Sequence, residues 1–216
     1  MPTICEELAR YGVKIVQAGL VAGAGGNISA RDGDRIWMKP SGLAMDETGP
    51  ADFCGLDLAS GRQTDGPHKP TSEWQMHLAV YRRRPDIQAL FHTHSPWASG
   101  VISSGATLQP MFAEFVCDLG RIGRLPYITP TTPALAEAVG AASETADTLF
   151  LANHGILALG VTMKQAYFRC LVVEDAAKSQ VAAAICGQPR FLTDAEQREL
   201  AGLDAAQHRV RMMERA

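Results

Sequence analysis

The chain has 216 residues, of which 46% are apolar and 20% are charged, and its formal net charge at pH 7 is -3. This composition is that of an ordinary soluble globular protein, long enough to bury a core of its own. The mild negative charge argues against a dedicated nucleic-acid binder, which normally presents a basic face. The tight basic run from Arg82 to Arg84 is expected to be a solvated helix end, where the helix dipole favours cations.

The five cysteines are scattered and form no C-x-x-C pair, which predicts reduced thiols in a cytoplasm-like compartment. The N-terminal stretch "MPTICEELARYG" carries two early glutamates and lacks a continuous apolar core, so it is not expected to be a signal peptide. No run approaches the ~18 apolar residues that a membrane helix needs. We therefore expect a cytoplasmic protein with neither a membrane nor a nucleic acid as partner.

The first half of the chain is predicted to combine helices with hairpins. Apolar residues at helical spacing, alternating runs around Asp-Gly and Ser-Gly turns, and a proline stop are the signals. The elements are a helix over 6–22, a hairpin over 27–42, a strand pair over 51–66, and a helix capped by Thr71 or Ser72 that runs through Glu73 and His77 until Pro85.

The second half is predicted to hold buried strands and a long helix, the latter opened by the capping pattern "TMKQ". The elements are strands over 87–94, 123–129, 147–155 and 156–160, and helices from Thr132, from Thr162 to about Cys186, and from Asp194. No repeat or linker is visible, so residues 1–216 are expected to form a single domain. The order indicates an α/β fold with a mixed or largely antiparallel sheet between helices, and does not suit a doubly wound parallel sheet.

Two sequence patterns are excluded as sites. "GAGGN" at 23–27 follows a helix instead of a strand and lacks the third glycine of a dinucleotide-binding loop. No G-x-S-x-G elbow is present to anchor a serine hydrolase.

His92 and His94 in "LFHTHSPW" lie two residues apart on a predicted strand, so their side chains point to the same face. His154 in "LANHGIL" ends another predicted strand. Three imidazoles with an open fourth position suit catalytic zinc, whereas a lone strand-end histidine is more often structural. The other histidines, His68, His77 and His208, are weaker candidates, and an i,i+4 pair of Glu73 with His77 is usually a local contact.

Glu73 in "KPTSEW" begins a helix, where a negative charge is favoured. It is either an ordinary helix-start glutamate or, beside a metal, a general acid/base. The loops "GGNIS", "KPSG" and "PTS" offer small residues, polar side chains and free N–H groups, which suit a phosphate dianion without a cluster of lysines. Each loop alone is also a common kind of turn.

Taken in order, "GGNIS", "KPSG", "PTSE", "HTHSP" and "NHG" resemble the motifs of the class II aldolase/adducin family, near its L-fuculose-1-phosphate aldolase type, over about residues 5–190. The resemblance implies a three-layer α/β/α sandwich around a mainly antiparallel, nine-stranded sheet. It also implies a homotetramer of C4 symmetry with active sites at the subunit interfaces.

The resemblance further implies the roles of individual residues. Zn²⁺, or another divalent transition metal, would be held by His92, His94 and His154. Glu73 would be both a resting ligand and the catalytic acid/base. The substrate phosphate would lie on Asn27, Ser41, Gly42, Thr71 and Ser72.

The implied reaction is cleavage of a ketose 1-phosphate, a small phosphorylated sugar, to dihydroxyacetone phosphate and an aldehyde through an enediolate. It needs no Schiff-base lysine. The chain departs from the fuculose-type pattern in three places. Ala24 stands where those members have threonine, "MFAEFVCD" has no tyrosine, and the C-terminal tail shows no clear match. Glu114 either replaces that tyrosine at the subunit interface or is an ordinary interface carboxylate.

Three other functions compete with the aldolase. A family decarboxylase of a sugar-acid phosphate and a methylthioribulose-1-phosphate dehydratase are the enzymatic alternatives. Glu73 favours the aldolase, because such decarboxylases tend to have lysine at this position. A non-catalytic, adducin-like assembly module is disfavoured, since all three histidines are present.

Overall fold

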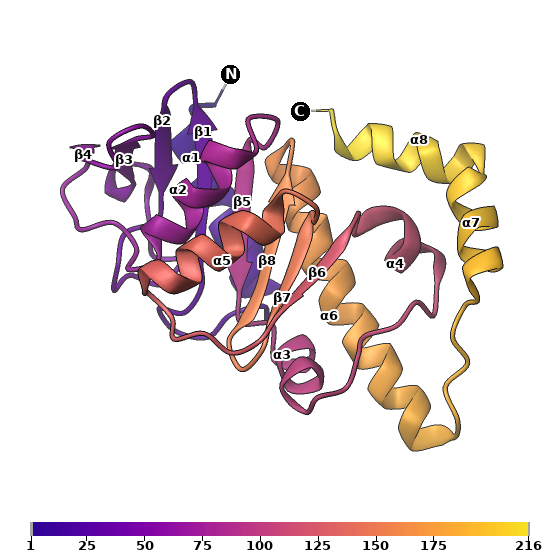
Figure 1. Ribbon diagram of the computed structural model, residues 1–216. Helices are drawn as coiled ribbons and strands as arrows, with labels where there is room; N and C mark the ends of the chain where they lie inside the picture. Colours follow the sequence, from indigo (N-terminus) through magenta and orange to yellow (C-terminus); the bar gives the residue numbers. More distant parts are fainter. Residues whose placement is uncertain (1, 216) are drawn as a thin grey trace.

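The computed structural model describes residues 2–215 and arranges them as one sheet with helices on both faces (Figure 1). This is the three-layer α/β/α architecture that the sequence predicted. The strands are β1 (Asn27–Asp32), β2 (Arg35–Met38), β3 (Cys54–Asp57), β4 (Gln63–Asp65), β5 (Ala89–Thr93), β6 (Ile122–Leu125), β7 (Thr148–Leu151) and β8 (Gly155–Gly160). The helices are α1 (Ile4–Gln17), α2 (Trp74–Arg83), α3 (Pro96–Ser103), α4 (Ala113–Asp118), α5 (Pro133–Ser143), α6 (Met163–Cys186), α7 (Asp194–Gly202) and α8 (Asp204–Met213), with a short 3-10 helix at Pro50–Asp52.

The strand order is β4-β3-β2-β1-β5-β8-β7-β6, and β6 with β7 is the parallel pair in an otherwise antiparallel sheet. The mainly antiparallel sheet is therefore confirmed. The resemblance implied nine strands, whereas residues 2–215 form eight. In the centre, β5 pairs with β1 on one side and β8 on the other, although β8 follows β5 by more than 60 residues.

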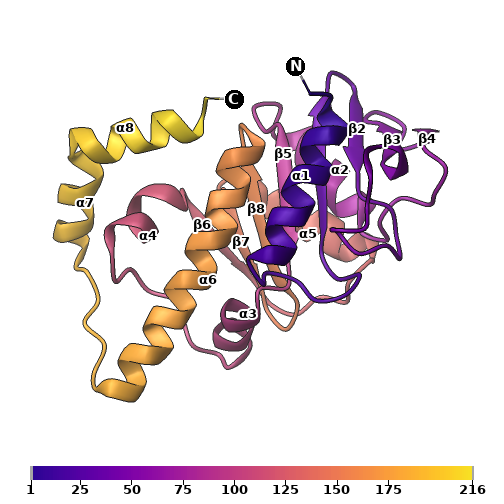
Figure 2. The ribbon, with the colours of Figure 1, turned by 180° about the vertical axis from the view of Figure 1, so that it is seen from behind.

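The sheet separates two hydrophobic cores, because successive side chains of a strand point to opposite faces. Phe91 and Ile156 pack with α1 and α6 on one face of the sheet. Figure 2 shows these two helices in front of the sheet. Leu90 and Leu157 pack with α2 and α5 on the other face. Continuous burial along β5 and β8 reflects this double cover, since an inner strand with helices on both faces has no solvated side.

Several predicted element boundaries are wrong by a few residues. The first helix ends at Gln17 instead of Ala22, and the C-terminal helix divides at Leu203 into α7 and α8. The helix predicted to run through Glu73 begins one residue later, at Trp74, which leaves Glu73 as its N-cap. Two short helices, α3 and α4, were not predicted. The long helix from Thr162 ends at Cys186, as expected.

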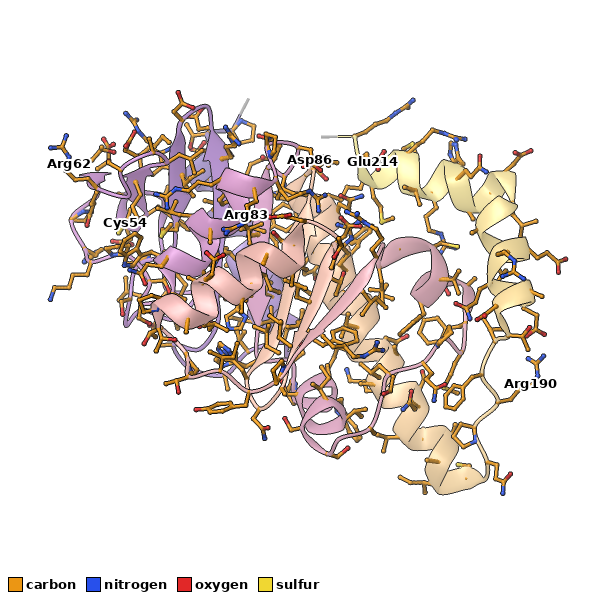
Figure 3. The ribbon with its side chains drawn as sticks, viewed as in Figure 1. Cys54, Arg62, Arg83, Asp86, Arg190 and Glu214 are labelled. Carbon is orange, nitrogen blue, oxygen red and sulfur yellow. The ribbon has the colours of Figure 1, made fainter. Side chains whose placement is uncertain are left out.

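The arginine run ends α2 as predicted and Arg82 is exposed, but Arg83 and Arg84 are not the solvated residues that the sequence predicted. Arg83 binds Glu137 of α5 at 2.7 Å, and Arg84 binds Asp147 at 3.0 Å with its side chain only 13% exposed. In Figure 3, Arg83 lies where α2 meets α5, whereas Arg62 and Arg190 project from opposite sides of the molecule. The run therefore fastens α2 to the neighbouring elements. Among residues 2–215, no helix has both the length and the apolar character to cross a membrane.

Candidate metal and phosphate site

The central strand pairing brings the two histidine motifs together. His92 lies opposite Asn27 of β1 and Leu157 of β8, and Gly155 opens β8 beside the end of β5. A Cβ at Gly155 would collide with the carbonyl oxygen of Thr93, and one at Gly26, where φ is +65°, would lie 2.7 Å from the carbonyl oxygen of His92. Only glycine permits these two close approaches.

The three predicted histidines converge through their Nε2 atoms. The Nε2 atom of His92 lies 3.0 Å from that of His94 and 3.2 Å from that of His154. His92 Nδ1 lies 2.8 Å from the carbonyl oxygen of Ile156, which can only accept, so Nδ1 carries the proton. The Nε2 atom of His92 therefore presents a lone pair to the centre of the cluster, the arrangement that orients a metal-binding imidazole.

Glu73 reaches the same centre from the start of α2. Its Oε2 lies 3.2 Å from His92 Nε2, its Oε1 lies 3.2 Å from His154 Nε2, and its backbone dihedrals (φ -100°, ψ 17°) fall in the sparsely populated bridge region. Burial opposes its ionisation, but the neighbouring His92 and His154 and a hydrogen bond from Asn27 outweigh burial and hold the Glu73 pKa well below its ordinary value. A buried carboxylate is thus present at the histidine cluster.

The geometry of this cluster fits a divalent ion. Tetrahedral zinc with Zn–N bonds of about 2.0–2.1 Å places its ligand atoms about 3.3 Å apart, close to the 3.0 and 3.2 Å separations between imidazole nitrogens. Burial lowers the His92 pKa to about 3, which favours the unprotonated ring that a metal ligand needs. An unprotonated nitrogen facing a carboxylate at 3.2 Å is repulsive unless a cation lies between them. His92, His94, His154 and Glu73 could together hold such a cation.

The predicted phosphate loops lie side by side next to this cluster. The 39–42 and 69–72 loops pair through bonds from Ser41 N to Lys69 O (2.9 Å) and from Thr71 N to Lys39 O (3.0 Å). Thr71 Oγ1 accepts from the Glu73 N–H at 3.3 Å. Ser41, Gly42 and Ser72 are exposed, whereas Asn27 and Thr71 are buried. The paired loops therefore bring four of the five predicted residues together, and the buried Asn27 is linked to them through Glu73, whose carboxylate it binds.

Lys39 is a buried cation that the sequence reasoning missed. Its side chain is 2% exposed, and Nζ donates to the carbonyl oxygens of Ala24 (3.3 Å) and Pro40 (3.2 Å), so it links the glycine-rich loop to the 39–42 loop. Burial lowers its pKa. Among residues 2–215 no carboxylate lies within ion-pair distance of it, which leaves a positive charge beside the predicted phosphate position. The motif "KPSG" contained the signal, but a strand-end lysine is usually solvated.

A family model described as "Class II Aldolase and Adducin N-terminal domain" matches residues 6–181. The chain belongs to this family.

Similarity to individual aldolases extends over most of the chain. The chain is 37% identical over 199 residues to 5-deoxy-D-ribulose 1-phosphate aldolase of Bacillus thuringiensis serovar kurstaki, and the match covers 91% of this chain and 92% of that one. It is 36% identical over 158 residues to L-fuculose phosphate aldolase of Methanococcus vannielii, covering 73% and 84%. A solved L-fuculose 1-phosphate aldolase matches with a TM-score of 0.84 and 31% identity, covering 93% and 96%. These relatives confirm the predicted fold and the prediction of a lyase enzyme.

Glu114 is not part of the histidine cluster of its own subunit. It belongs to α4 and binds Arg209 of α8 at 2.9 Å. That hydrogen bond lowers the Glu114 pKa. The C-terminal helices therefore fasten α4 from outside, and a role for Glu114 at a neighbouring active site stays a prediction.

The acid sensitivity of folding can be predicted from His77, which is fully buried in α2. Burial lowers its pKa to about 4, below the 6.5 of an exposed histidine. The unfolded chain binds this proton first, so stability is lost as pH falls from 6.5 towards 4, by up to about 3 kcal/mol at 1.36 kcal/mol per pH unit. We expect His77→Gln to remove this part of the pH dependence in urea unfolding of metal-free protein. The exposed His208→Gln variant is the control, and equal slopes for His77→Gln and wild type would contradict the prediction.

Proposed function

We propose that this protein is a zinc-dependent class II aldolase that cleaves a ketose 1-phosphate to dihydroxyacetone phosphate and an aldehyde. The observation that carries the proposal is the convergence of three imidazole nitrogens and the Glu73 carboxylate beside the paired 39–42 and 69–72 loops. Both relatives and the solved structure described above are named as aldolases of sugar 1-phosphates or of a sugar phosphate, which supports the same substrate class.

The reaction breaks the C3–C4 bond of the ketose: the C4 hydroxyl gives up its proton and C4 becomes the aldehyde carbon, while the bonding electrons stay on C3, which then gains a proton. When bound, a divalent ion supplies Lewis-acid polarisation of the substrate carbonyl and stabilises the charge that develops during cleavage. Glu73 moves the proton at C3, because its carboxylate faces the same centre as the three histidines. Its location at the site, rather than at an exposed helix start, favours the acid/base interpretation.

The loops around Ser41, Gly42, Thr71 and Ser72 bind the substrate phosphate, assisted by Asn27 as the family resemblance implies. Lys39 adds one positive charge behind them, which a dianion needs in a partly buried position. Fixing the phosphate in this way orients the sugar so that its carbonyl end meets the histidine cluster.

We infer that the active form is a homotetramer in which a neighbouring subunit covers this open site. Ser41, Gly42 and Ser72 are exposed in the single chain, and Trp97, three residues after His94, is 47% exposed. Exposed tryptophan is enriched at protein interfaces. Glu114, whose side chain on α4 is 44% exposed beside Arg209, would be presented to such a neighbour, and the cytoplasm remains the expected location.

A family decarboxylase and a methylthioribulose-1-phosphate dehydratase remain the alternative activities. Glu73 separates the decarboxylase from the aldolase, since a lysine in its place would put a second cation at the metal position. The carboxylate instead balances the charge of a divalent ion. The same intact ligand set supports an enzyme over a non-catalytic assembly module.

The metal assignment predicts the behaviour of His94→Ala. Wild-type protein is expected to retain about one zinc per chain after dialysis, because four ligand atoms converge. His94→Ala removes one imidazole and is expected to lose most of this metal, measured by atomic emission. His208→Ala, which removes an exposed histidine, should keep the full content. Full retention in His94→Ala would refute the site.

The substrate class is tested with a panel of ketose 1-phosphates that includes 5-deoxyribulose 1-phosphate and fuculose 1-phosphate. Release of dihydroxyacetone phosphate, followed with a coupled dehydrogenase, is the expected result. Sugar-acid phosphates and methylthioribulose 1-phosphate form the second arm. Carbon dioxide from the former, or dehydration of the latter without cleavage, would replace the aldolase proposal with that activity.

Glu73→Gln tests the acid/base role at nearly constant shape. The amide cannot exchange a proton at carbon, so kcat is expected to fall by at least ~10², the usual scale for this kind of catalysis. Glu199→Gln, at an exposed position of α7, should leave kcat unchanged. Turnover of Glu73→Gln near the wild-type rate would show that another group moves the proton.

A further inference from the structure

A chain of buried polar side chains leads away from Glu73 into the protein. Asn27 Nδ2 lies 2.9 Å from Glu73 Oε2, and the other side of the Asn27 amide, Oδ1, is bound to His77 Nε2. His77 Nδ1 lies 2.6 Å from Ser29 Oγ, which lies 2.9 Å from the hydroxyl of Tyr81. All five residues are at most 6% exposed. Two strand β1 residues and two helix α2 residues therefore form one continuous connection to the N-cap of α2.

Elementary chemistry fixes which atom donates and which accepts in each hydrogen bond of this series of side chains. The ionised Glu73 carboxylate can only accept, so the Asn27 amide nitrogen faces it and the amide oxygen faces His77. His77 Nε2 must then carry the proton, and Nδ1 is the acceptor. The Ser29 hydroxyl donates a hydrogen bond to Nδ1 and accepts one from the Tyr81 hydroxyl. The Asn27, His77, Ser29 and Tyr81 side chains all have hydrogen-bond partners in this one arrangement, as a buried polar network requires.

The direction also distinguishes the two oxygens of Glu73. Oε2 accepts from Asn27. Oε1 is buried and has no hydrogen-bond donor among the described residues, although it lies 3.2 Å from His154 Nε2. One oxygen is therefore anchored and the other is free at the histidine cluster.

We propose that Asn27, His77, Ser29 and Tyr81 form a positioning chain for Glu73, in which His77 fixes the Asn27 amide so that Oε2 is held and Oε1 exchanges the substrate proton. This inference rests on the proposed acid/base function of Glu73. It gives Asn27 a different principal task from the phosphate contact that the resemblance implied, because its amide oxygen and one amide hydrogen are already engaged.

The surroundings of His77 support this assignment. The side chain is fully buried, and burial lowers its pKa to about 4, so it remains neutral at pH 7 with one donor and one acceptor nitrogen. A protonated ring would donate from both nitrogens and would oppose the Ser29 hydroxyl hydrogen. Tyr81 is also buried, so water does not compete for the hydrogen bond between its hydroxyl and Ser29.

Two substitutions at His77 separate positioning from simple packing. Gln can place its amide nitrogen near the position of Nε2 and keep the bond to Asn27, whereas Leu has a comparable apolar bulk and no donor. We expect His77→Leu to lower kcat by about 10- to 100-fold, the scale for losing a partner that orients an active-site group. KM and zinc content should change less than about twofold, and His77→Gln should recover most of the kcat.

Tyr81→Phe provides a second variant in case His77→Leu does not fold. It removes only the terminal hydroxyl, so we expect a smaller loss in kcat, again without a change in KM. Equal losses in His77→Gln and His77→Leu, or a rise in KM alone, would overturn the positioning chain. An unchanged kcat in both His77→Leu and Tyr81→Phe would overturn it as well.

A readout independent of activity is the tautomer of His77. Nitrogen NMR of the metal-free protein labelled at its histidines, with His77 assigned from its absence in His77→Gln, should show a neutral ring protonated at Nε2 at pH 7. A ring protonated at Nδ1, or at both nitrogens, would overturn the inferred direction. If the tautomer is as expected but no ketose 1-phosphate is cleaved, the proposed function is wrong. The assigned donors and acceptors of the hydrogen bonds from Asn27 to Tyr81 are then still correct.

Discussion

The pairing of β5 with β8 is the constraint on which the rest of the site depends. It joins segments far apart in the sequence and lays His92 beside Leu157, with His154 in the turn just before β8. Because both strands are inner strands covered by helices on both faces, their register is fixed by two cores at once. A slip of one residue would turn His92 away from the cluster and point apolar side chains at the two other histidines.

Local patterns predicted the parts of this arrangement that depend on neighbouring residues. The alternation in "LFHTHSPW" correctly placed His92 and His94 on one side, and the Asp-Gly turn after β1 set the first hairpin. The capping threonine at Thr162 correctly opened the long helix α6. Each of these signals is read within a few residues, so no tertiary contact was needed to interpret it.

Long-range contacts decided what the sequence did not predict. The connection from Glu73 to Asn27 and His77 joins residues about 50 positions apart, and a histidine on a helix face does not reveal that its partners come from a strand. Arg84 likewise forms an ion pair with Asp147, which is distant in sequence. The sequence alone did not show this partner, so Arg84 was expected in solvent. Lys39 was missed because burial of a lysine depends on two loops meeting around it.

The charge of Lys39, which has no carboxylate partner among residues 2–215, would link the stability of the protein to the binding of an anion. Within the described part of the chain this ammonium is desolvated and donates to carbonyl oxygens alone, an environment that favours loss of its proton and loosening of the two loops. An anion seated in front of those loops would supply the missing counter-charge in the folded state alone. If these loops bind phosphate as proposed, folding and phosphate binding are thermodynamically coupled, and an occupied site resists unfolding better than an empty one.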